Sequence, residues 1–192
     1  MLSWKELCSA EPELGEACRA LLYQYGVGLA FLGTVRPDGG PRLHPVCPVI
    51  SDWGLFAFLI PSPKRDDLHR DARYALHSFP AEENEDAVYL MGTATSVSDP
   101  ELRAELAAQF FRERDLAEPM PGFEQQELFE FGIGRCLRTI STGHGDPNPT
   151  HIVWRAPSAR DRLTVLTETY QFVAEHETRT DRTIPVVEPR RV

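Results

Sequence analysis

The chain has almost no lysine: only Lys5 and Lys64 among its 20 basic residues are lysines, and the others are arginines. It also has no excess of positive charge, because 29 acidic residues give a formal net charge of -9. Such a protein repels nucleic-acid phosphates and anionic membrane surfaces. We therefore expect no nucleic-acid partner, and a phosphate-bearing ligand would need a local positive site.

Cysteine is scarce and scattered, and long apolar runs are missing near the N-terminus. The cysteines form no C-x-x-C pair, which is typical of a reducing compartment: they are Cys8, Cys18, Cys47 and Cys136. Charged residues such as Lys5 and Glu6 interrupt the first apolar stretch. We therefore expect a cytoplasmic protein with neither a signal peptide nor a membrane span.

Several motifs of enzyme chemistry are absent. The chain has no Walker phosphate loop, no H-E-x-x-H and no G-x-S-x-G elbow. Gly26, Gly28 and Gly33 have the wrong spacing for a dinucleotide fingerprint, and they open a strand instead of a helix. His144 and His151 have no third ligand at a fixed spacing, so we expect no metal site.

The length of 192 residues predicts one domain of about 150 residues with extensions. Residues 1–25 are predicted to form a helical extension, one helix that begins at the Ser3–Glu6 capping box and stops at Gly26. Residues 26–155 are the predicted domain, and residues 156–192 form a polar C-terminal extension.

Short apolar runs separated by turn signals dominate the central part of the chain. Pro45 and Pro48 lie within one run, so that strand should be irregular or lie at an edge. The hairpin order favours a mostly antiparallel sheet closed into a small barrel. The strands are expected at 27–36, 42–50, 55–60, 74–79, 87–97, 128–140 and 151–154, with a short helix near 68–72 and a longer one from Pro100.

Two polar segments, residues 34–46 and 61–73, carry the most chemistry. In the second, Ser62 and the adjacent cations Lys64 and Arg65 lie between an apolar strand and a helix start. Free backbone N–H groups and the helix dipole favour an anion there. The segment therefore predicts a phosphate site, with a solvated charged loop as the alternative.

These segments resemble the flavin-binding split-barrel family, also called the pyridoxamine 5'-phosphate oxidase-like family. Members commonly show a D-G-x-P turn, an H-P-V-like element and an S-x-K-x-x-x-L loop and helix. The matching stretches here are Asp38 to Pro41, His44 to Val46, and Ser62 to Lys64 with Leu68; the stretches 71–77 and 91–94 also match.

The resemblance implies a mainly β (α+β) fold, a six-stranded antiparallel split β-barrel with flanking helices. It also implies a homodimer with FMN at the interface, with the C-terminal extension packed on the partner. Carried over to this chain, Ser62 and Lys64 hold the 5'-phosphate with Arg65 beside them. The other implied contacts are His44, Pro45 and Val46 against the ring or phosphate, and the backbone of Leu59 and Ile60 at the ring's polar edge.

The chain departs from the oxidases that act on pyridoxamine phosphate. His44, Val49 and Ala87 stand where those enzymes have arginine, lysine and glutamine, and no R-L-H element occurs near the C-terminus. These differences disfavour vitamin oxidation. The expected function is an FMN-dependent oxidoreductase acting on a small molecule, with no catalytic side chain assigned; an F420- or haem-binding protein, or a non-catalytic carrier or sensor, is the alternative.

Overall fold

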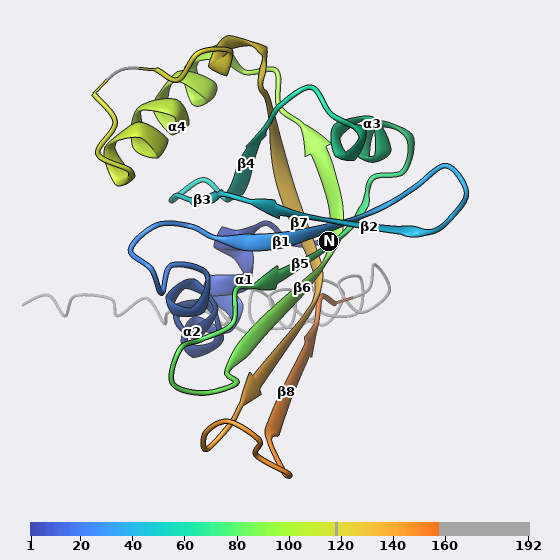
Figure 1. Cartoon of the computed structure of the whole chain (residues 1–192), viewed down its shortest axis with the longest axis vertical. Coiled ribbons are helices and arrows are strands. Elements are labelled where there is room, and N and C mark those ends of the chain that lie inside the picture. Colours follow the sequence, from blue (N-terminus) through green and yellow to red (C-terminus); the bar gives the residue numbers. More distant parts are fainter. Residues whose placement is uncertain (118, 158–192) are drawn as a thin grey trace, which may run out of the picture. The chain divides into compact units, whose positions relative to one another are not determined.

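The computed structural model describes residues 1–117 and 119–157 (Figure 1). Within this part, Met1–Ala156 forms one compact unit. The predicted C-terminal extension lies outside the described residues from position 158 onward.

The centre of the unit is one curled antiparallel sheet, as predicted. Its strands are paired in the order β2-β1-β5-β6-β7-β4-β3, and β8 pairs with the far end of β7. The strands are β1 (Ala30–Val35), β2 (Pro41–Val46), β3 (Pro48–Ile50), β4 (Leu55–Leu59), β5 (Arg73–Ser78), β6 (Ala87–Ser96), β7 (Glu127–Ile140) and β8 (Thr150–Arg155).

The two ends of this pairing order, β2 and β3, are one bent strand interrupted at Cys47. β2 pairs with β1, whereas β3 pairs with β4. Since proline cannot donate to a ladder, Pro45 and Pro48 favour this change of partner, and the predicted irregularity is confirmed. Counting the bent strand once and setting β8 aside leaves the six strands of the predicted barrel.

The N-terminal extension differs from its prediction, because it forms two helices: α1 (Trp4–Ala10) and α2 (Pro12–Leu22). The Ser3–Glu6 capping box is present, since each residue bonds the other's backbone N–H. Pro12 lacks an N–H and stands in the first turn of a second helix, where that costs nothing. The prediction of a single helix overlooked this proline and was wrong.

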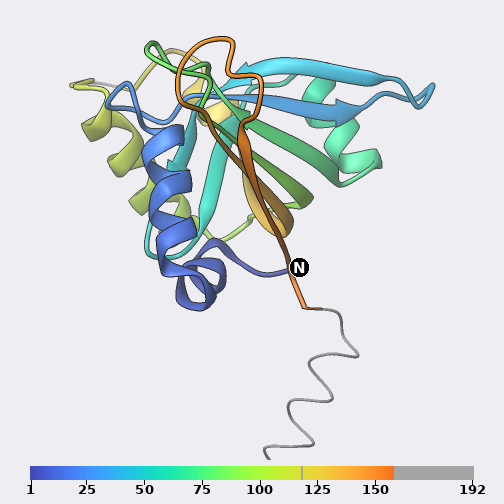
Figure 2. The ribbon, with the colours of Figure 1, turned by 90° about the horizontal axis from the view of Figure 1, so that it is seen from below.

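Strand β4 is buried on both faces, as its continuous apolar sequence predicts. Leu55, Ala57 and Leu59 join the main core inside the sheet, which also receives α1 and α2. Phe56 and Phe58 belong to a second hydrophobic cluster against α4 (Pro100–Glu113). Figure 2 shows α2 and α4 on one side of the molecule and the β1–β2 hairpin extending on the other.

Strand β7 is long and pairs with two different strands along one of its edges. Its first residues pair with β4 and its last residues with β8, while β6 runs along the other side. The register of β6 and β7 shifts between Met91 and Gly92. A Cβ at Gly92 would lie 1.8 Å from the Gly132 carbonyl oxygen, so only glycine fits this irregularity.

Candidate functional site

Helix α3 (Pro63–Arg70) brings the two polar segments of the sequence together. Its Asp67 is buried and accepts hydrogen bonds from Thr34 Oγ1 at 2.9 Å, Arg42 Nε at 2.6 Å and Arg70 at 3.1 Å. Burial alone would raise the pKa of Asp67, but these hydrogen bonds outweigh it and hold the pKa below its usual value. The carboxylate thus fixes α3 against β1 and β2.

A second set of contacts fixes α3 to the start of β7. Glu127 accepts hydrogen bonds from Ser96 Oγ at 2.5 Å and pairs with His69 Nε2 at 2.8 Å. Burial raises the pKa of Glu127, but the bonds from Ser96 and His69 outweigh it and lower that pKa overall. Arg65 also turns to this side: its Nε lies 3.7 Å from Glu127, and it donates to the Gln125 carbonyl.

Lys64 differs from the other cations of α3. Within the described part of the chain its ammonium has no hydrogen bond and no ion pair, although the side chain is half-buried. Burial lowers the pKa of Lys64, and the nearby Cys47 thiol opposes this shift. The lysine therefore lies beside the junction of β2 and β3, with no counter-charge supplied among the described residues.

The first turn of α3 has no side-chain cap. Ser62 occupies the N-cap position, but its hydroxyl donates to the Ile60 carbonyl at 2.9 Å instead of accepting from the helix. The backbone N–H groups of Arg65 and Asp66 donate to the Ser62 carbonyl. The N–H of Lys64 lies one residue before them in the first turn of the helix. The positive end of the helix is thus left to solvent or a ligand.

Strand β2 contributes His44 to the same side of the fold. In a strand, alternate residues share a face, and Arg42, His44 and Val46 lie on the face that reaches α3 through Arg42 and Asp67. His44 Nε2 is buried without a hydrogen-bond partner in residues 1–117 and 119–157. Val46 is packed in the core, and Pro45 is exposed on the opposite face.

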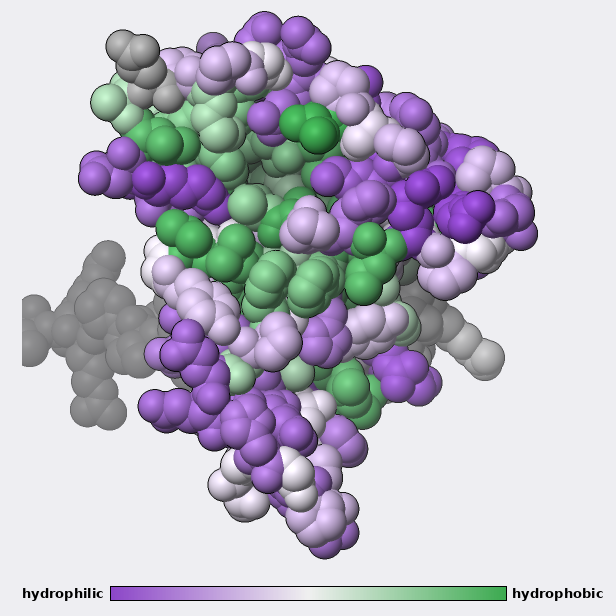
Figure 3. Space-filling model, viewed as in Figure 1, coloured by the Kyte–Doolittle hydropathy of each residue, from purple (hydrophilic) through white to green (hydrophobic). Residues whose placement is uncertain are grey.

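The two residues at the end of β4 have different environments. Leu59 is buried in the main core, whereas Ile60 is 50% exposed. Hydrophobic residues gather over β1, β2 and β3 in Figure 3, and the surface is hollowed between them and the part formed by β4 and α4. Leu43 of β2, with 66% exposure, is another large apolar residue open to solvent.

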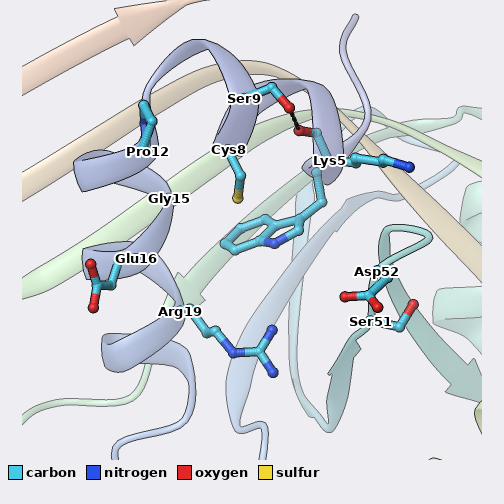
Figure 4. A pocket seen from close by; sticks show the side chains of 10 residues that line it. Lys5, Cys8, Ser9, Pro12, Gly15, Glu16, Arg19, Ser51 and Asp52 are labelled. Atoms are coloured by element: carbon cyan, nitrogen blue, oxygen red, sulfur yellow. Dashed lines mark hydrogen bonds between the residues drawn. The ribbon is translucent and has the colours of Figure 1, made fainter.

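A cavity of about 600 Å³ lies elsewhere, between α1, α2 and the turn after β3. In Figure 4, Arg19 from α2 and Asp52 from the turn reach into it from different sides, and Cys8 points into the space between the helices. None of the predicted site residues lines this cavity.

Sequence reasoning selected Ser62, Lys64 and His44, and the fold places all three around the contact of α3 with the bent strand. It missed Cys47 beside Lys64, and it missed Asp67 as the group that joins the two polar segments. Two of the three partners of Asp67, Arg42 and Thr34, lie 25 and 33 residues away in the sequence, so no local pattern could reveal these contacts.

Among the described residues, no group of three or more His, Cys, Asp or Glu side chains is placed to hold a metal ion. No helix in that part of the chain is long and apolar enough to cross a membrane.

Comparisons with known proteins show the fold. No family model and no curated protein matches the chain. A heme binding protein from Mycobacterium smegmatis has a TM-score of 0.56 at 16% identity, over 72% of this chain and 57% of its own. This chain therefore spans less than two thirds of that protein.

Two further structures cover more of their own length. A candidate pyridoxamine 5'-phosphate oxidase from Listeria innocua has a TM-score of 0.52 at 14% identity, over 65% of this chain and 96% of its own. A candidate 5-nitroimidazole antibiotic resistance protein from Bacteroides thetaiotaomicron has a TM-score of 0.52 at 12% identity, over 63% and 80%. The chain has the split-barrel fold found among pyridoxamine 5'-phosphate oxidase-like proteins.

Proposed function

We propose that this protein is an FMN-binding oxidoreductase whose cofactor lies between the bent strand β2–β3 and the N-terminal end of α3. The observation that carries the proposal is Lys64, a half-buried cation without a counter-charge among the described residues. A phosphate ester would supply that charge.

Lys64 differs in this respect from the arginines of α3. Arg65 and Arg70 already contact the carboxylates of Glu127 and Asp67, so their charges are compensated within the fold. Lys64 has lost part of its hydration without such compensation, which is unfavourable for the free protein. A phosphate at the uncapped first turn would bind both the ammonium and the free backbone N–H.

His44 supports a ligand on the same side. A buried ring nitrogen without a partner costs free energy, which a hydrogen bond from or to a bound molecule recovers. His44 therefore fits a polar atom of the cofactor, either on its phosphate or on its ring. When bound, a flavin supplies hydride or electron transfer, and the side chains bind, orient and shield it.

The exposed apolar residues near the site support a homodimer. Leu43 and Ile60 are 66% and 50% exposed; Ile60 lies two residues before Ser62, and Leu43 lies on the face of β2 opposite His44. In the proposed arrangement a second copy of the chain covers them and completes the site, as the family resemblance implies. A small-molecule substrate would enter where the two copies meet the flavin ring.

Haem is the second candidate, because His44 also suits an axial ligand and a protein of the same fold is named for heme binding. F420, which also carries phosphate, would use Lys64 in the same way. A carrier or sensor would bind the cofactor without turning over a reductant.

The visible absorption spectrum of the purified protein, followed by release and mass measurement of the bound molecule, tests the proposal. FMN absorbs at about 450 nm and F420 at about 420 nm. A protein that is colourless and gains no thermal stability from FMN contradicts it. Reduction of bound flavin by NADPH with multiple turnovers separates the oxidoreductase from a carrier.

A further inference from the structure

Two buried cysteines from distant parts of the chain lie against each other. Cys18 of α2 and Cys136 of β7 have their Sγ atoms 3.5 Å apart, although 118 residues separate them. Both side chains have 0% exposure, and both are free thiols. This contact joins α2 to the longest strand of the sheet, which Leu2 also meets through backbone hydrogen bonds with Ile133.

A charged side chain lies near the buried pair. Arg138 lies on the same strand as Cys136, and its Nε is buried without a partner among the described residues. The Sγ–Sγ hydrogen bond, in which either thiol can be the donor, and the charge of Arg138 lower the pKa of Cys136 against the effect of burial. The same hydrogen bond and burial raise the pKa of Cys18.

We propose that Cys18 and Cys136 are an oxidisable pair, and that a peroxide converts them into a disulfide that fastens α2 to β7. The thiolate of Cys136 attacks one peroxide oxygen; the O–O bond breaks and hydroxide leaves, which gives a sulfenic acid on Cys136. Cys18 Sγ then attacks that sulfur, the S–O bond breaks, and hydroxide leaves as water with the Cys18 proton. In total, two thiols and one hydrogen peroxide give one disulfide and two water molecules.

The geometry requires a small movement. A disulfide needs its sulfur atoms at about 2.05 Å, so the two must approach by about 1.5 Å from their present separation. The cavity between α1, α2 and the turn after β3 does not reach either sulfur atom, so a small oxidant must pass the contact of α1 with α2 to meet the pair. The cavity is lined by Cys8 and by Gly15, which precedes Cys18 by one turn of α2.

The disulfide would fasten a helix that also braces the bent strand. Tyr23, the residue that ends α2, accepts a hydrogen bond from Ile50 N–H at 2.9 Å, and its own hydroxyl bonds Glu113 at 3.2 Å. Oxidation would therefore hold the N-terminal helices on the sheet beside β3. A disulfide between these two thiols needs no cofactor and does not depend on the proposed function.

The experiment uses the full, reduced chain treated with hydrogen peroxide under native conditions. We expect the intact mass to fall by about 2 Da and a disulfide-linked peptide pair to contain Cys18 and Cys136. The melting temperature should rise by about 5–15 °C, because the cross-link constrains a long loop of the unfolded chain. A reducing agent should reverse both changes.

Single cysteine substitutions show which thiols cause the gain in melting temperature. Cys18→Ala and Cys136→Ala should each lose the gain in melting temperature, whereas Cys8→Ala and Cys47→Ala should keep it. If a variant at the buried pair does not fold, the peptide map of the unsubstituted protein decides. A map in which Cys8 or Cys47 is oxidised while the buried pair stays reduced overturns the proposal, as does a cross-link that leaves the melting temperature unchanged.

Discussion

Helix α3 carries two ionic groups that the fold treats in opposite ways. Asp67, on the side facing β1 and β2, is buried and accepts hydrogen bonds from three side chains. Lys64, one turn earlier, has no hydrogen bond or ion pair within the described residues. A buried charge with hydrogen-bond partners inside the protein stabilises the fold. A half-buried charge without such partners is stabilised when a ligand of opposite charge binds beside it.

We expect the largest loss of stability when the buried carboxylate of Asp67 is removed. Asp67→Ala removes the acceptor for Thr34 and two arginines, and we expect it to lower the free energy of unfolding by about 3 kcal/mol. Asp66→Ala, at the exposed neighbouring residue, should change it by less than about 0.5 kcal/mol. Urea denaturation of the two variants measures the difference, and equal effects would contradict the structural role of Asp67.

The same carboxylate should make stability depend on pH in acid. Its pKa in the folded protein lies below the ordinary value of 3.8, so its contribution is fully present above pH 3.8 and is lost as the pH falls through the folded value. The stability gap between the unsubstituted protein and Asp67→Asn should therefore shrink below pH 3.8. Urea midpoints measured from pH 6 to pH 2.5, approximately, check this; a gap independent of pH would show that Asp67 does not titrate as inferred.

His44, like Lys64, has a polar atom without a partner among the described residues. His44→Phe removes a buried nitrogen without a partner, so stability without cofactor should stay equal or rise by up to about 1 kcal/mol. Cofactor affinity should fall by about 5–10-fold, because one hydrogen bond is lost. His69→Phe is the contrast: it breaks the bond to Glu127 and should lower stability instead. Thermal melts with and without FMN separate the two outcomes.

The smallest expected effect is on stability at Lys64. Lys64→Met removes a half-buried cation that bonds no described residue, so unfolding without cofactor should change by less than about 0.5 kcal/mol. Lys5→Met, at the chain's other and exposed lysine, is the matched control. A large loss of stability at Lys64 alone would mean that the lysine has a structural role.

The sequence allowed much of the fold to be predicted, where the signals were local. The turn at Pro37 to Gly40, the doubly buried β4 and the helix that Asp99 caps all follow from adjacent residues. The break at Pro12 was equally local and was overlooked. The exchange of partners at Cys47 was anticipated only as an irregularity, because pairing depends on strands elsewhere in the chain.

The candidate site divides in the same way. Ser62 and Lys64 were found because a hydroxyl and a cation stand together at a helix start. Arg65 lies beside Glu127, 62 residues later in the sequence, whereas Lys64 has no partner among the described residues. Local sequence patterns do not encode a contact of such long range, so this difference between the two cations could not be predicted. The contact between Cys18 and Cys136 is of the same long-range kind.

The role of Lys64 in phosphate binding is tested by comparing FMN with riboflavin, which lacks the phosphate, in binding to the unsubstituted protein and to Lys64→Met. Fluorescence titration should show FMN bound about 5–150-fold more tightly than riboflavin by the unsubstituted protein, from a charge-assisted contact of about 1–3 kcal/mol. In Lys64→Met this preference should largely disappear, while riboflavin affinity stays the same. An undiminished preference for FMN in Lys64→Met would contradict the assignment of Lys64 to the phosphate.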